Sequence, residues 1–184
     1  MRKRYLFLVI AVTFGLALHM VERYTTGITS PLPETDAKEA DYYGEKLIHR
    51  QYSNNGKLQQ TLMATESHYY PDSGLTHFSS PALVSQNDTG GWQINAAKGR
   101  LSDNSTQLYL EDDVRIQSVT GEPDFLLLET SRLTYHADRG QATTNDPVTI
   151  RSRRGTTHAT GISLDTFSQR LTLKSDVRTR YEQH

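Results

Sequence analysis

The sequence has no cysteine among its 184 residues, which excludes several kinds of site at once. Thiol catalysis, disulfide cross-links and cysteine-ligated zinc all require that side chain. An excess of positive charge is also missing, because the formal net charge is −1. A nucleic-acid-binding domain normally presents a strongly basic face, so we expect no nucleic-acid partner.

Hydrophobic residues are scarce as well, at 35% of the chain. This content is low for a globular protein, and some of it lies in an apolar run at the N-terminus. The remainder cannot fill a thick core. It is enough to fill the thin interior between two sheets, or to line a groove.

Known catalytic and metal-binding motifs are missing too. The histidines form neither an H-x-H nor an H-E-x-x-H pattern, and the chain contains no G-x-S-x-G and no phosphate-binding loop. A periplasmic carbohydrate-active enzyme would show clustered acidic or aromatic residues, but only Trp92 and scattered tyrosines are available. We therefore expect no enzyme activity, no catalytic residue, no metal site and no cofactor.

The N-terminus has the pattern of a membrane segment. Arg2, Lys3 and Arg4 precede an apolar stretch that no charge interrupts. The length and the flanking charges predict a cytoplasmic tip at 1–4 and a single transmembrane anchor at 5–22. A cleaved signal peptide is the alternative, and in both cases the rest of the chain crosses the membrane.

A proline-containing polar segment follows the apolar stretch. Pro31 and Pro33 lie among small polar residues, which disfavours both helix and strand. We expect a flexible linker over 23–41 and a single domain over 42–184.

Within that domain a seven-residue pattern recurs about every thirty residues. "LEDDVRI" at 110–116 is followed by "TNDPVTI" at 144–150 and "LKSDVRT" at 173–179, and a looser copy, "FSSPALV", occupies 78–84. Each copy follows a strand-like segment, a turn signal and a second strand-like segment. Short strands at this spacing predict an all-β domain built from a repeated unit.

The alternation of side chains predicts one buried face for each strand. Leu108, Leu110, Val114 and Ile116 share one parity, whereas Tyr109 has the other. In the last copy, Leu171, Leu173, Val177 and Tyr181 likewise share one parity and are expected to face inward.

The polar centre of each copy is interpreted as a bend that carries the strand from one sheet to a second, facing sheet. Asp112 and Asp113 could instead form a catalytic acid and base, but the other copies place serine or proline there, as at Ser80 with Pro81. A bend tolerates such replacement and a catalytic pair does not. The expected fold is an open β-sandwich or jellyroll with a thin apolar slot.

This repeat, together with "GGWQINAAKG" at 90–99 and the order of parts after the N-terminal run, resembles the OstA-like lipopolysaccharide transport proteins, the LptA–LptC β-jellyroll family. The resemblance covers essentially the whole chain. It implies a periplasmic β-jellyroll on a single-pass inner-membrane helix, with lipopolysaccharide acyl chains held between the sheets. It also implies that lipopolysaccharide passes from an LptBFG-type ABC transporter to an LptA-like periplasmic protein on its way to the outer membrane.

The residues expected to carry these roles fall into three groups. The inward apolar face expected to bind lipid comprises Phe78, Trp92, Ile94, Leu108, Leu110, Val114, Ile116, Leu133, Val148, Ile150, Ile162 and Leu164. The C-terminal edge expected to dock the partner comprises Leu171, Leu173, Val177, Arg178, Thr179, Arg180 and Tyr181. Gly161 is expected to be a structural small residue at a close backbone approach or a bulge.

Alternatives remain for the first two groups. The apolar residues could simply pack against each other, and the last strand could be an ordinary edge protected by its charges. The protein would then be an assembly adaptor that docks partner strands without binding lipid. An edge that docks a partner can also dock a second copy, so weak self-association is a further expectation.

Overall fold

The computed structural model describes residues 40–87, 90–103, 106–119 and 126–181. The chain divides into a unit of residues 1–39 and a unit of residues 40–184, and only the second is described below. The predicted cytoplasmic tip, the anchor and nearly all of the predicted linker lie outside the described residues. Within the described ranges, no helix is long and apolar enough to cross a membrane.

All regular structure in the described residues is β, and it forms one antiparallel sheet of 11 strands, which confirms the all-β prediction. The strands are β1 (Tyr42–Tyr52), β2 (Leu58–Tyr70), β3 (Leu75–Ser79), β4 (Ala82–Asn87), β5 (Gly90–Asn95), β6 (Lys98–Ser102), β7 (Gln107–Ser118), β8 (Leu126–His136), β9 (Gln141–Ser152), β10 (Gly155–Asp165) and β11 (Arg170–Tyr181).

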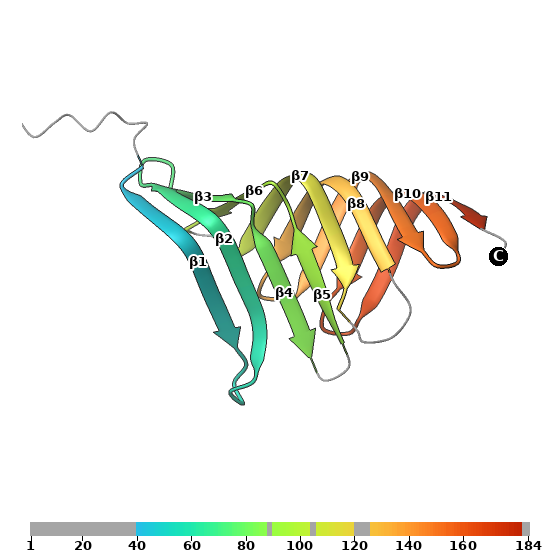
Figure 1. Ribbon diagram of the computed structural model, residues 1–184, viewed down its shortest axis with the longest axis horizontal. Helices are drawn as coiled ribbons and strands as arrows, with labels where there is room; N and C mark the ends of the chain where they lie inside the picture. Colours follow the sequence, from blue (N-terminus) through green and yellow to red (C-terminus); the bar gives the residue numbers. More distant parts are fainter. Residues whose placement is uncertain (1–39, 88–89, 104–105, 120–125, 182–184) are drawn as a thin grey trace, which may run out of the picture. The chain divides into compact units, whose positions relative to one another are not determined.

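The pairing pattern creates two layers. The strand order is β11-β10-β9-β8-β7-β5-β4-β2-β3-β6, with β1 added to β2 and a further pairing of β6 with β7. The first half of β7 pairs with β6 and its second half pairs with β5. Because one strand has different neighbours on its two halves, it must pass from one layer to the other, and Figure 1 shows the long strands bending along one side of the sheet.

The bends lie at the polar centres of the repeated pattern, as predicted. Asp112 and Asp113 have φ angles of 62° and 50°, and the β7–β8 register shifts between Glu111 and Val114. Asp176 in β11 and Ser80 before β4 also have positive φ. Short polar side chains tolerate this left-handed conformation better than bulky or β-branched ones, which explains the polar centres of these three copies. The copy at 144–150 has no residue with a positive φ.

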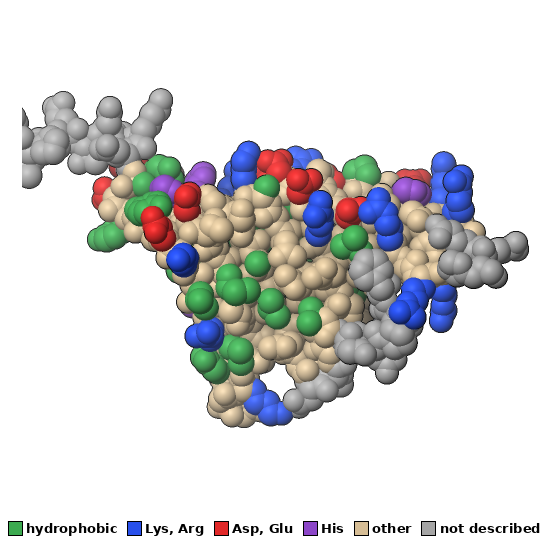
Figure 2. All heavy atoms as spheres, in the orientation of Figure 1, with side chains coloured by type: hydrophobic (Ala, Val, Ile, Leu, Met, Phe, Trp, Pro, Cys, Tyr) green, Lys and Arg blue, Asp and Glu red, His purple; other side chains and the backbone are tan. Residues whose placement is uncertain are grey.

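The predicted parity holds in β7. Leu108, Leu110, Val114 and Ile116 are at most 4% exposed, whereas Tyr109 is 37% exposed. Figure 2 shows charged side chains gathered along the side where the strands bend, while the face over β4 and β5 carries few charges.

The prediction that β11 buries one face is wrong for the second half of the strand. Leu171 and Leu173 pack against the core, but Val177 is 51% exposed and Tyr181 is 74% exposed. Among the described residues β11 pairs only with β10, so it is an edge strand. Every residue from Lys174 to Tyr181 is exposed, so the second half of β11 has no buried face.

Candidate functional site

The interior between the two layers is one continuous apolar cluster. All twelve residues predicted for the inward face belong to it, and each is at most 7% exposed. They come from six strands, β3, β5, β7, β8, β9 and β10. The structure therefore brings together side chains that are spread over almost ninety positions of the chain.

Three large members of this cluster were not predicted. Leu83, Leu128 and Tyr135 are 4%, 0% and 1% exposed. Leu128 ends a run of three leucines, which hides the alternation, and Leu83 lies close behind Pro81. Tyr135 has the parity of Leu133, and that signal would have placed it inside.

Side chains fill this interior in the structure. Leu110 is 1% exposed and Ile116 is fully buried, so almost none of their surface is available to an acyl chain while the layers keep their present separation. An acyl chain could reach them only if the layers part. The sheltered surface would then be available to methylene groups, each of which gains about 0.8 kcal/mol on leaving water.

A few polar groups interrupt the apolar interior at its far side from the bends. Gln60 in β2 and Ser85 in β4 are backbone partners in adjacent strands, and they are 4% and 1% exposed. The Ser85 hydroxyl donates to the Thr166 Oγ1 at 3.0 Å, and the Thr166 hydroxyl donates to the Gly140 carbonyl at 2.8 Å.

Two further hydrogen bonds join the same parts of the domain. The Gln60 side-chain amide donates to the Ala137 carbonyl at 3.1 Å, and the Asn87 amide donates to the Phe167 carbonyl at 2.7 Å. The acceptors lie in the turns after β8 and after β10, whereas the donors lie in β2 and β4. The tips of two hairpins from one layer are thus held against the opposite layer by side-chain hydrogen bonds.

Tyr135 lies at this polar end of the interior. Its phenol is buried beside the Ser85 and Thr166 hydroxyls, and burial raises the pKa of the Tyr135 phenol above its usual value, while those two neighbours lower it. The phenol is therefore neutral at physiological pH and presents a hydroxyl group, not a charge.

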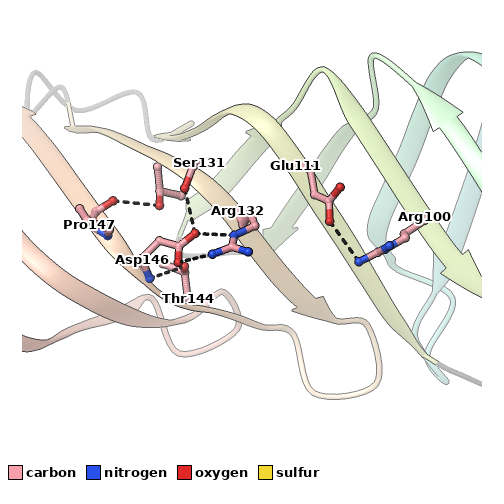
Figure 3. A network of polar contacts seen from close by, with 8 residues as sticks. Arg100, Glu111, Ser131, Arg132, Thr144, Asp146 and Pro147 are labelled. Atoms are coloured by element: carbon pink, nitrogen blue, oxygen red, sulfur yellow. Dashed lines mark hydrogen bonds and ion pairs between the residues drawn. The ribbon is translucent and has the colours of Figure 1, made fainter.

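The outer face at the bends carries a network of polar side chains (Figure 3). Arg132 donates to Asp146 with two hydrogen bonds of 2.8 and 3.0 Å, and the Ser131 hydroxyl donates to the same carboxylate at 2.8 Å. These bonds, from Arg132 first and then Ser131, lower the pKa of Asp146. Nearby, Arg100 pairs with Glu111 at 3.1 Å.

A hollow of about 420 Å³ opens beside this network. Its rim includes Arg100, Arg132 and Lys174, and Leu110 and Leu133 contribute to its wall. The rim cations are already satisfied by the neighbouring Glu111, Asp146 and Asn145 side chains. These contacts stabilise the outer surface at the bends. Among the described residues, no group of three potential metal ligands is present.

The predicted docking edge lies on β11, one of the two outermost strands of the sheet. Five of its seven residues, Val177 to Tyr181, are exposed, while Leu171 and Leu173 are partly buried against the core. The opposite edge is β1, where Ile48 is 55% exposed. Both edges of the described sheet therefore offer apolar side chains beside unpaired strand backbone.

Gly161 lies at the bend of β10 with a φ of 75°. A Cβ atom added there would lie 3.0 Å from the Thr144 carbonyl oxygen and 2.8 Å from the Lys174 Cδ. Both the backbone conformation and the close approach of β9 favour glycine at this position.

Comparisons with known proteins agree with this architecture. The family described as "Lipopolysaccharide-assembly, LptC-related" matches residues 6–182. The lipopolysaccharide export system protein LptC of Haemophilus influenzae is 26% identical over 163 residues, covering 77% of each chain. The protein of the same name from Escherichia coli K12 is 24% identical over 178 residues, covering 94% of this chain and 89% of the relative.

A solved structure resembles the fold. LptH, described as the LptA-homologous periplasmic component of the lipopolysaccharide transport device of Pseudomonas aeruginosa, superposes with a TM-score of 0.50. The two sequences are 9% identical, and the match covers 67% of this chain and 95% of LptH. The likeness identifies the two-layered sheet as the jellyroll of that protein and confirms the predicted fold.

Proposed function

The chain belongs to the LptC-related family of lipopolysaccharide-assembly proteins, and from this premise we propose that it carries lipopolysaccharide through its β-jellyroll during export. The acyl chains lie between the two layers, against the inward apolar face. The cargo comes from an ATP-driven transporter of the LptBFG type and continues to an LptA-like protein toward the outer membrane. The protein performs a transport step and no chemical reaction.

The observation that carries this proposal is the single apolar interior lined by the twelve inward residues. An acyl chain of a dozen carbons needs about ten kcal/mol of shelter from water. A surface assembled from six strands is large enough to offer comparable shelter once the layers part. The low hydrophobic content of the chain makes this concentration inside one slot more significant.

The exposed edge of β11 is proposed to dock the LptA-like partner. An edge strand with unpaired backbone groups can accept a strand from another chain, and exposed apolar side chains such as Val177 add contact surface. The same edge would allow weak pairing of two copies of this chain. Docking there would continue the apolar slot from one protein into the next.

As a member of this family, the chain is a component of the cell envelope. We propose more specifically that residues 5–22 anchor it in the inner membrane, with the N-terminus in the cytoplasm and residues 42–184 in the periplasm. The sequence pattern of the N-terminal run supports this placement.

Site-specific photo-crosslinking in cells tests the proposal. A photoreactive residue replaces Leu110, which is 1% exposed, or as a control the adjacent Tyr109, which is 37% exposed on the other face. We expect a lipopolysaccharide adduct at position 110 and none at position 109. No adduct at position 110, in a folded and membrane-associated protein, would favour the adaptor that docks strands without binding lipid.

A further inference from the structure

We propose that the turn of residues 166–169, between β10 and β11, is a latch that closes the interior against β4 and must release before an acyl chain can enter. This inference rests on the proposed lipid-carrying function and adds the route by which the interior opens. The latch is the hairpin tip whose Thr166 and Phe167 contact Ser85 and Asn87 of β4.

The need for an opening follows from burial. Every residue of the proposed lipid-binding face is at most 7% exposed, so the closed domain offers no contact to a long acyl chain. The bends form one side of the interior, and there the backbone of each long strand runs continuously from layer to layer. The side away from the bends is where separate parts of the chain meet, so it can open without breaking a strand.

The contacts at that side are polar, unlike the rest of the interior. Ser85 and Thr166 are each 1% exposed and hydrogen-bond to each other, although 81 residues separate them in sequence. Asn87 holds the next residue of the same turn through its carbonyl. Water can replace hydrogen bonds of this kind when the groups separate, whereas parting apolar surfaces leaves them exposed. The polar contact is therefore the place where the two layers part most easily.

Hydrogen bonds within the turn hold its conformation. The Asp165 carboxylate accepts hydrogen bonds from the backbone N–H groups of Phe167 and Ser168, both at 2.9 Å. The Gln169 side chain donates to the Thr166 carbonyl at 2.7 Å. These internal bonds do not depend on β4, so the tip keeps its shape when it leaves that strand.

The turn of residues 166–169 packs against Gly140 in the turn after β8. A Cβ atom on Gly140 would lie 2.7 Å from atoms of the Phe167 ring, so the ring packs directly on the glycine backbone. The hydroxyl of Thr166 bonds the Gly140 carbonyl as well. The neighbouring hairpin tip also contacts the opposite layer through Gln60 and Ala137, so releasing the latch loosens the end of the interior at which both tips meet β2 and β4.

A reversible disulfide tests the latch. Ser85→Cys with Thr166→Cys places two thiols where the hydroxyl oxygens are now 3.0 Å apart, and the chain contains no other cysteine. The matched control is Glu66→Cys with Ser79→Cys, because these residues lie opposite each other in β2 and β3 and their side-chain oxygens are 3.4 Å apart on an exposed surface. Both pairs are introduced into the full chain carrying the photoreactive residue at position 110, purified in detergent and incubated with purified lipopolysaccharide.

We expect oxidation of the Ser85–Thr166 pair to reduce the lipopolysaccharide adduct at least tenfold, and dithiothreitol to restore it. Oxidation of the control pair should leave the adduct within twofold of the unmodified chain. An unchanged adduct in the oxidised latch pair, or an equal loss in the control, would overturn the latch. The absence of any adduct in the chain without cysteines would overturn the lipid-carrying function and the latch with it.

A second variant tests the opposite direction and does not depend on disulfide geometry. Ser85→Ala together with Asn87→Ala removes the two side chains of β4 that hold the turn. The adduct at position 110 should form several-fold faster than in the unmodified chain. Slower formation in this variant, with thermal unfolding showing a folded domain, would contradict the proposal.

Discussion

Arg132 in β8 holds Asp146 in β9 through two hydrogen bonds, of 2.8 and 3.0 Å, where the backbone ladder between these strands is interrupted. The β8–β9 pairing runs to Glu129 with Thr149 and resumes at Thr134 with Thr143. At the bend, side chains replace the missing backbone bonds, as Figure 3 shows. The network therefore closes an opening in the outer wall of the jellyroll.

The first prediction concerns the pH dependence of this closure. Arg132 and Ser131 lower the pKa of Asp146 in the folded state. The ionised carboxylate therefore stabilises the fold fully above the pKa of aspartate in the unfolded chain, which is about 4, and this stabilisation is lost as the pH falls through the lower pKa of the folded state. Asp146→Asn should lower the free energy of unfolding at pH 7, and the difference from the unmodified chain should shrink as the pH falls below about 4. Urea unfolding between pH 7 and pH 3 measures both.

The control for this experiment is Asp112→Asn at another bend. Asp112 pairs with Lys98 at 3.0 Å, but its side chain is 62% exposed, against 18% for Asp146. Water screens such an exposed pair, so the control should change stability less at pH 7. A loss in Asp146→Asn that is the same at pH 7 and pH 3 would show that the carboxylate charge is not what stabilises the bend.

A second prediction concerns Gly161. Gly161→Ala should lower the free energy of unfolding by about 2 to 3 kcal/mol, because a positive φ and contact with the β9 backbone both disfavour a side chain. Gly56 is the matched control, since its φ is 80° and no atom would lie within 4 Å of an added Cβ. Gly56→Ala should cost only about 1 kcal/mol.

Gly161→Arg extends the same test. Its side chain would have to displace Lys174 and the β9 backbone near Thr144, so we expect it to prevent accumulation of the protein in cells. A Gly161→Arg protein that is stable and exports lipopolysaccharide normally would contradict the structural role. Equal costs for Gly161→Ala and Gly56→Ala would show that the close approach of β9 has no effect.

Local sequence patterns predicted the parts of this fold that depend on local geometry. Side chains alternate along a strand and one face is buried, so the inward residues of β7 could be read directly from the order Leu108, Tyr109, Leu110. The polar centres predicted the bends for a similar reason, because few residue types tolerate positive φ at Asp112, Asp113 and Asp176.

Features that depend on distant parts of the chain could not be predicted in this way. The parity of Val177 is that of an inward residue, but nothing in the neighbouring sequence tells whether another strand covers it. Ser85 and Thr166 are ordinary small polar residues, which are common at surfaces. Their contact depends on how the two layers cross, and the crossing is set by the twist and lengths of many strands together.

A third prediction tests the inward face by stability. Leu110→Ala should lower the free energy of unfolding by about 2 to 5 kcal/mol, since Leu110 is 1% exposed within the core cluster. Tyr109→Ala should cost less, about 1 kcal/mol or below, because Tyr109 is 37% exposed and makes only surface contacts with Gln107 and Arg100 among the described residues. Thermal or urea unfolding compares the two. Similar costs at the two adjacent positions would contradict the alternation on which the inward face depends.

The last prediction concerns the edge of β11. Val177→Asp with Tyr181→Asp should weaken binding of the purified LptA-like partner at least tenfold, because both side chains are more than half exposed beside the unpaired strand and a charge there disfavours strand addition. The same exposure means that unfolding should change by less than about 0.5 kcal/mol. Ile48→Asp is the control, because Ile48 is 55% exposed on β1 at the opposite edge, and it should leave partner binding unchanged. Binding that survives the β11 substitutions but is lost with Ile48→Asp would move the docking site to β1, and the slot would then continue into the partner from the other end of the sheet.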